Sequence, residues 1–147
     1  MQPIETHFME LSKPNANPKM LITQSGTNRL PYIMAIKEMA RGFYHDTYHL
    51  ALPTDDISLE EYFEEIAYAF GTRERTQNKI KREIVSLAKS SRDPIFLLIT
   101  DFENDLHLDA FAKFMRSILD QVDGKIKLIT IGGERLANLQ TNMGIHS

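Results

Sequence analysis

The chain has 147 residues, of which 42% are hydrophobic and 25% charged, proportions typical of a globular domain with one core and not of a disordered chain. Its formal net charge of −3 gives no electrostatic reason to expect nucleic acid, because dedicated binders usually carry a basic excess. The absence of cysteine excludes disulfides, a thiolate zinc site and a cysteine nucleophile.

The compartment follows from two further features of the sequence. The opening Met1–Glu5 has neither a basic start nor an apolar core, so it does not resemble a secretory signal. No apolar run approaches the roughly 20 residues that a bilayer-spanning helix needs. We therefore expect a cytoplasmic protein with no membrane partner.

The first 18 residues differ from the rest of the chain. Pro3, Pro14 and Pro18 stand among polar residues, a pattern that predicts an irregular N-terminal arm with one helical turn near Phe8–Leu11. Residues 19–147 are expected to form a single α/β domain.

Apolar strand patterns and amphipathic helix patterns alternate after residue 18. Proline, glycine and the Ser58/Glu61 capping box separate them. Such alternation predicts a parallel sheet covered by helices. Strands are expected over 19–23, 44–52, 95–99 and 125–131, and helices over 31–42, 58–70, 76–89 and 108–122, with a short helical segment over 134–139 and a cap for the 108–122 helix at Asn104 or Asp105.

The run Ile95–Ile99 is apolar without alternation, which indicates a strand buried on both faces. It ends in Thr100, Asp101 and Glu103. Ligands of parallel sheets bind beyond the carboxyl ends of the strands, so these three residues are candidate site residues. The fold predicted is a three-layer α/β sandwich with a mostly parallel sheet.

The order of these segments resembles the core of a P-loop ATPase of the AAA-like type. The likeness covers residues 19–140: the strand and glycine-containing loop of 20–31, the segment 50–63, the Walker B-like segment 96–103, and the segment 127–139, which resembles the next strand and the sensor region. It implies a P-loop NTPase-like fold, a site for ATP and magnesium, and use of the domain's flanks in assemblies.

The loop in the phosphate-binding position departs from the family pattern. A P-loop has the form GxxxxGK followed by Ser or Thr, with glycines for backbone approach, a lysine for the phosphates and a hydroxyl for magnesium. This loop, Gln24–Pro31, has one glycine and no lysine, and Pro31 removes an amide at the helix start. Its candidate anion-binding residues are Ser25, Gly26, Thr27, Asn28 and Arg29; a tight turn is the alternative.

The Walker B-like segment departs as well. Matching Phe102 to the family's phenylalanine places Thr100 at the magnesium position and Asp101 at the catalytic glutamate position. Matching Asp101 to the metal-binding aspartate places Phe102 at the catalytic position. Either register lacks one carboxylate. Because phosphoryl transfer depends on positioned charges, the resemblance implies a degenerate ATPase core.

The remaining candidates each have an alternative explanation. Asp101 and Glu103 are weak metal-ligand candidates, or form a polar loop that caps the next helix. Arg135 could approach a neighbour's ligand, or pair with Glu134 on the surface. The i, i+4 pair His45 and His49 falls in a predicted strand, where that spacing does not favour metal binding.

The functional prediction is a non-catalytic AAA-like binding or regulatory module that self-associates or binds a protein partner, with no cofactor expected. An atypical ATP- or GTP-binding protein using Arg29 and Asp101 is one alternative. Binding of an acidic partner or nucleic acid through a basic helix over 73–89 is another. Glu74 and Glu83 dilute that positive charge, so a solvated face is the simpler explanation. The basic residues are Arg73, Arg75, Lys79, Lys81, Arg82 and Lys89.

Overall fold

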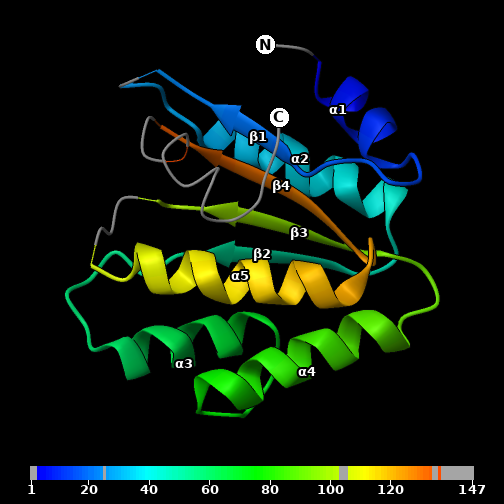
Figure 1. Cartoon of the computed structure of the whole chain (residues 1–147). Coiled ribbons are helices and arrows are strands. Elements are labelled where there is room, and N and C mark those ends of the chain that lie inside the picture. Colours follow the sequence, from blue (N-terminus) through cyan, green and yellow to red (C-terminus); the bar gives the residue numbers. More distant parts are fainter. Residues whose placement is uncertain (1–2, 25, 103–105, 134–135, 137–147) are drawn as a thin grey trace.

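The computed structural model describes residues 3–24, 26–102, 106–133 and 136. Within them, four parallel strands form one sheet (Figure 1). The elements in chain order are α1 (Ile4–Leu11), β1 (Lys19–Ile22), α2 (Leu30–Phe43), β2 (Thr47–Ala51), α3 (Leu59–Ala69), α4 (Gln77–Ser90), β3 (Ile95–Thr100), α5 (Leu108–Val122) and β4 (Ile126–Gly132).

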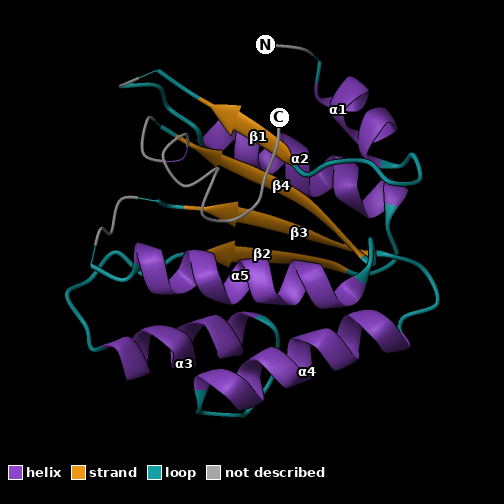
Figure 2. Cartoon of the chain, in the orientation of Figure 1, coloured by secondary structure: helices purple, strands orange, loops and turns teal. Residues whose placement is uncertain are grey.

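Helices cover both faces of the sheet, as Figure 2 shows, so the predicted three-layer α/β sandwich is confirmed. Alternate residues of β3 enter different cores. Leu97 and Ile99 pack in the larger core with α3, α4 and α5, whereas Phe96 and Leu98 pack in the smaller core with α1 and α2. All six residues of β3 are buried, the property that its unbroken apolar run predicts.

The strand order is β1-β4-β3-β2. The chain crosses from β1 at one edge to β2 at the other through α2. It then returns through α3 and α4 to β3, and through α5 to β4. Strands β2 and β3 are in register with His49 opposite Leu98 and Ala51 opposite Thr100. This register brings residues that are 51 positions apart in sequence, His49 and Thr100, to the same end of the sheet.

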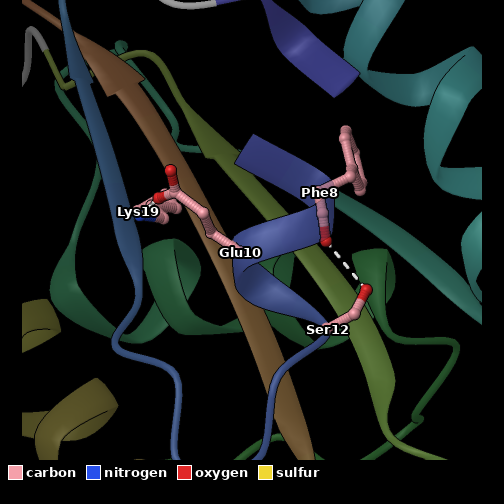
Figure 3. A network of polar contacts seen from close by, with 4 residues as sticks. All are labelled: Phe8, Glu10, Ser12 and Lys19. Atoms are coloured by element: carbon pink, nitrogen blue, oxygen red, sulfur yellow. Dashed lines mark hydrogen bonds and ion pairs between the residues drawn. The ribbon is translucent and has the colours of Figure 1, made fainter. Parts of the chain in front are cut away.

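Helix α1 corrects the prediction of an irregular arm. Pro3 immediately precedes the helix with a non-helical ψ of 142°, and Phe8 and Leu11 are buried in the smaller core. Figure 3 shows two contacts that fix its C-terminal end: Ser12 Oγ donates to the Phe8 carbonyl at 2.8 Å, and Glu10 pairs with Lys19 of β1. The apolar spacing 4, 8, 11 is helical, and the flanking prolines lie outside the helix.

Two buried polar side chains accompany α1. Lys127 of β4 is 7% exposed and donates from Nζ to the Lys13 carbonyl at 3.2 Å, which ties the segment after α1 to the sheet. Burial lowers the pKa of Lys127. His7 is 8% exposed, and neither ring nitrogen has a hydrogen-bond partner in the described part of the chain. Burial, followed by the charge of Lys19, lowers the pKa of His7.

The start of α3 has the predicted cap: Ser58 Oγ accepts from the Glu61 amide at 3.1 Å. Thr76 Oγ1 accepts from the Lys79 amide at 3.4 Å and caps α4, a contact that was not predicted. The residue before α5 is His107, which makes no side-chain cap. Asn104 and Asp105, the predicted caps of α5, and most of the 134–139 segment lie outside the described residues. No helix of the described segments has the length and apolarity to cross a bilayer.

Candidate functional site

The carboxyl ends of β1, β4 and β3 form the place where a parallel sheet binds ligands. The chain leaves β1 toward α2 on one face and leaves β3 toward α5 on the other, with β4 between them. Connections that diverge to opposite faces define a switch point. We call the residues gathered there the strand-end site; they are Thr23, Arg29, Asp101, Phe102 and Gly132.

Arg29, the loop's only cation, is held by the strand ends. Its Nε donates to Thr23 Oγ1 at 2.8 Å, and Thr23 Oγ1 donates in turn to the Gly132 carbonyl at 3.3 Å. The guanidinium Nη2 lies 3.1 Å from the position that a Cβ on Gly133 would occupy. The side chain therefore lies over the end of β4.

The start of α2 offers few amides to an anion. The Leu30 amide donates to Asn28 Oδ1 at 3.2 Å, residue 31 is a proline, and the Ile33 amide donates to the Arg29 carbonyl at 2.9 Å. In a phosphate-binding loop, consecutive amides at the helix start point toward the ligand. Positions 30 and 31 cannot supply such a pair while Asn28 keeps this bond.

The loop before α2 is a turn built around Gly26. That glycine has φ +82°, in the left-handed region, and the space around it is open. The Thr27 amide donates to the Gln24 carbonyl at 3.1 Å, closing the turn. The alternative of a tight turn is therefore present at Gly26 and Thr27, while Ser25 lies outside the described residues.

Asp101 has a non-glycine left-handed backbone, with φ +67°. Such conformations cost free energy and often occur at functional positions, and aspartate tolerates them better than most residues. Its Oδ2 accepts from Thr100 Oγ1 at 3.2 Å, and the same hydroxyl lies 2.9 Å from His49 Nε2. This hydrogen bond joins the sequence neighbours Thr100 and Asp101 at the carboxyl end of β3, whereas Glu103 lies outside the described part.

His49 belongs to this series of hydrogen bonds with Thr100 and Asp101, and the sequence analysis did not predict that it would. Thr100 has one hydroxyl proton, which goes to the carboxylate, so His49 Nε2 carries the proton that it shares with Thr100. Burial is the largest cause that lowers the pKa of His49, and the charge of Lys37 adds to it, against the opposing effect of Asp101. The neutral ring therefore presents Nδ1 as an acceptor.

Phe102 closes the other side of the strand-end site. It is 2% exposed, and its ring carbon Cδ2 lies 3.2 Å from the position of a Cβ on Gly132. Leu136, which is fully buried, approaches the same position to 3.3 Å. An apolar side chain thus occupies the place beside the β3 and β4 ends. Arg135 lies outside the described residues, so its predicted approach to a ligand stays a prediction.

The basic residues of the 73–89 segment divide into two groups. Arg73 and Arg75 precede α4, which begins at Gln77, so the predicted basic helix is shorter than expected. Lys81, Arg82 and Lys89 line an open groove of about 790 Å³ between α4 and Gln121 of α5. The Lys81 ammonium also donates to Ser117 Oγ at 3.2 Å. The lining runs along α4 from Asn78 in its first turn to Ser90 at its end.

Across the described ranges, no three His, Asp or Glu side chains cluster closely enough to hold a metal ion. His45 lies outside β2 and pairs with its neighbour Asp46, so the two histidines predicted to share a strand do not do so.

Comparison with known proteins shows the fold. The chain matches no protein-family profile and no curated protein sequence. Among solved structures, it is similar to Cdc6p from Pyrobaculum aerophilum, with a TM-score of 0.60 and 15% sequence identity over 95% of this chain. The match covers 43% of that protein, so the chain spans less than half of its length. The fold is therefore an α/β sandwich with a parallel sheet, as predicted, and it is shared with that solved structure.

Proposed function

We propose that this chain is a non-catalytic AAA-like binding or regulatory module that keeps the scaffold of a nucleotide-binding core without its phosphate-handling groups. The observation that carries the proposal is the Arg29–Thr23 hydrogen bond of 2.8 Å. It directs the loop's cation to the end of β4, where the neighbouring Phe102 is buried. The arrangement favours a closed strand end over an open phosphate cradle.

The state of Asp101 supports the same proposal. An aspartate that binds a divalent cation shares it with several other oxygen ligands. The Asp101 carboxylate instead accepts a hydrogen bond from the Thr100 hydroxyl at 3.2 Å. With Phe102 next to it, the Walker B-like segment supplies one carboxylate within the described residues. Loss of the lysine and of one carboxylate removes the electrostatic stabilisation on which phosphoryl transfer depends.

Equilibrium binding of labelled ATP with magnesium tests the proposal against the atypical ATP- or GTP-binding alternative. We expect a dissociation constant of about 1 mM or weaker, unchanged by Arg29→Ala. Micromolar binding that Arg29→Ala and Asp101→Asn both weaken would establish the alternative, in which Arg29 replaces the lysine and Asp101 holds magnesium.

Self-association, or binding of a protein partner, completes the proposal. Leu30 and Met34 stand one turn apart on α2 and are 59% and 61% exposed. Exposed apolar side chains on one helix face favour a protein contact there. Light scattering at two protein concentrations tests self-association, with Leu30→Ser and Met34→Ser together expected to reduce the mass to that of a monomer. A mass that does not depend on concentration and equals one chain would refute self-association.

The groove on α4 favours a second candidate function, the binding of an acidic partner such as nucleic acid. Lys81, Arg82 and Lys89 line it together, although the chain as a whole is acidic. Binding through phosphate contacts would fall steeply as salt rises, and Lys81→Gln with Arg82→Gln would flatten that dependence. Lys113→Gln, on the exposed surface of α5, is the control. A flat salt response of the unaltered chain would eliminate this candidate.

A further inference from the structure

A second pocket, separate from the strand-end site and from the α4 groove, lies between α2 and the edge strand β2. It has a volume of about 220 Å³ and is lined by Lys37, Ala40 and Arg41 of α2, Thr47, Tyr48 and His49 of β2, and Phe96 of β3. His49 and Phe96 lie on the sheet face that α2 covers. The pocket is smaller than the roughly 300 Å³ at which cavities for drug-sized ligands begin, so only a small ligand would fit.

Two of the residues that line the pocket, Lys37 and Arg41, are cations. Lys37 and Arg41 are four residues apart on α2, a spacing at which like charges repel and destabilise a helix. Neither Lys37 nor Arg41 forms an ion pair with any described residue. This includes Glu38, which lies between them in the sequence. Two cations that line one pocket and form no ion pair with a described residue make that pocket suited to an anion.

His49 adds a titratable hydrogen-bonding group to this environment. Its Nε2 is engaged by Thr100, which leaves Nδ1 to accept when the ring is neutral and to donate when it is protonated. The charged groups that act on His49 are Lys37 of α2, which opposes protonation, and Asp101 after β3, which favours it. Arg41 of α2 also lines the pocket. A bound anion would offset the two cations and allow the ring to take its second proton.

We propose that Lys37, Arg41 and His49 form a binding site for a small tetrahedral oxyanion, a phosphate or sulfate group, at the β2 edge of the sheet. Lys37 and Arg41 supply charge, and protonated His49 donates from Nδ1 to the anion. The hydrogen bonds from His49 to Thr100 and from Thr100 to Asp101 connect this pocket to the strand-end site. Binding of the anion would therefore also affect the hydrogen bond that Asp101 accepts. The site does not depend on nucleotide binding at Arg29.

The test follows the ring resonances of His49 by NMR across about pH 5 to 8, the range in which histidines titrate. Buffers contain chloride, sulfate, phosphate or glycerol phosphate at one ionic strength of about 0.15 M, so that screening is equal. His49→Gln assigns the resonance. Sulfate serves because it does not titrate in this range, and glycerol phosphate distinguishes a phosphate ester from the free ion.

We expect the His49 pKa to be higher in sulfate and phosphate than in chloride. Each unit by which the pKa rises means that the anion binds about tenfold more tightly when His49 is protonated than when it is neutral, because linkage is reciprocal. Lys37→Gln with Arg41→Gln should abolish the rise. The matched double control on α5, Lys113→Gln with Arg116→Gln, removes the same charge and should leave it. An equal rise in glycerol phosphate extends the site to phosphate monoesters; a rise confined to the inorganic ions restricts it to free oxyanions.

Three results would overturn the site. One is an equal His49 pKa in all four buffers. A second is an oxyanion-dependent rise that persists in the Lys37→Gln, Arg41→Gln protein while its circular dichroism matches that of the unaltered chain. The third is a larger response at the exposed His45 than at His49, which would indicate general surface binding.

Discussion

Replacing Arg29 by alanine separates a structural role of this residue from a nucleotide-binding role. Its Nε donates to Thr23 Oγ1 at 2.8 Å in a partly buried setting. A hydrogen bond with a charged partner contributes about 1.5–3 kcal/mol net, and solvent screening of the exposed part reduces this to about 1–2 kcal/mol. We therefore predict that Arg29→Ala lowers the free energy of unfolding by about 1–2 kcal/mol, a decrease in Tm of about 2–4 °C per kcal/mol for a chain of this size.

A double-mutant cycle isolates the contact itself. Thr23→Val removes the acceptor and keeps the shape of the side chain. Urea unfolding of both single variants and the double variant should give a coupling free energy of about 1 kcal/mol, since the bond exists only when both residues are present. Arg29→Lys keeps the charge without Nε, so it should behave as the alanine variant does. Coupling below about 0.3 kcal/mol, the usual error of additivity, would refute the structural role.

The same unfolding experiment, repeated with ATP and magnesium, tests the rival role. A ligand at 100 times its dissociation constant stabilises the folded state by about 2.7 kcal/mol. We predict no such increase for the unaltered chain. An increase that disappears in Arg29→Ala would show that the guanidinium leaves Thr23 to bind phosphate.

Three further predictions concern stability. Phe8→Ala should cost about 3–5 kcal/mol, because its fully buried ring packs 5.3 Å from those of Phe43 and Phe96; Met9→Ala, at an exposed position, should cost less than about 0.5 kcal/mol in the same urea titration. The pKa of His7 is lowered in the folded state, so the unfolded chain binds more protons below pH 6.5 and stability falls as the pH drops through that value. His7→Leu should reduce this dependence, measured by unfolding at pH 7 and about pH 5, and a His7→Leu slope equal to that of the unaltered chain would contradict the assignment. Gly71→Ala should cost about 1–2 kcal/mol in thermal unfolding through its left-handed φ of +72° alone, since no atom lies within 4 Å of the added Cβ; an unchanged Tm would refute this cause.

Features that depend on local pattern could be predicted from the sequence. The unbroken run of Ile95–Ile99 indicated a strand covered on both faces, and β3 is buried at every position. Ser58 with Glu61 marked the start of α3, where the Ser58 hydroxyl caps the helix. Both signals can be recognised within a few consecutive residues of the sequence.

Features that depend on register or packing could not be predicted. His49 meets Thr100 only because β2 and β3 pair in one register, and Thr23 meets the Gly132 carbonyl only because β4 lies beside β1. The early prolines concealed α1, whose eight residues are stabilised by the burial of Phe8 and Leu11 rather than by helix propensity. Long-range contacts of this kind leave no spacing in the sequence.

Release of inorganic phosphate from ATP and magnesium by the purified chain tests the loss of catalysis most directly, with Asp101→Asn measured beside the unaltered protein. We predict rates equal to the buffer background for both proteins, far below the roughly 1 s⁻¹ at which typical enzymes begin. An enzyme-like rate in the unaltered chain that Asp101→Asn abolishes would show that the strand-end site still performs phosphoryl transfer.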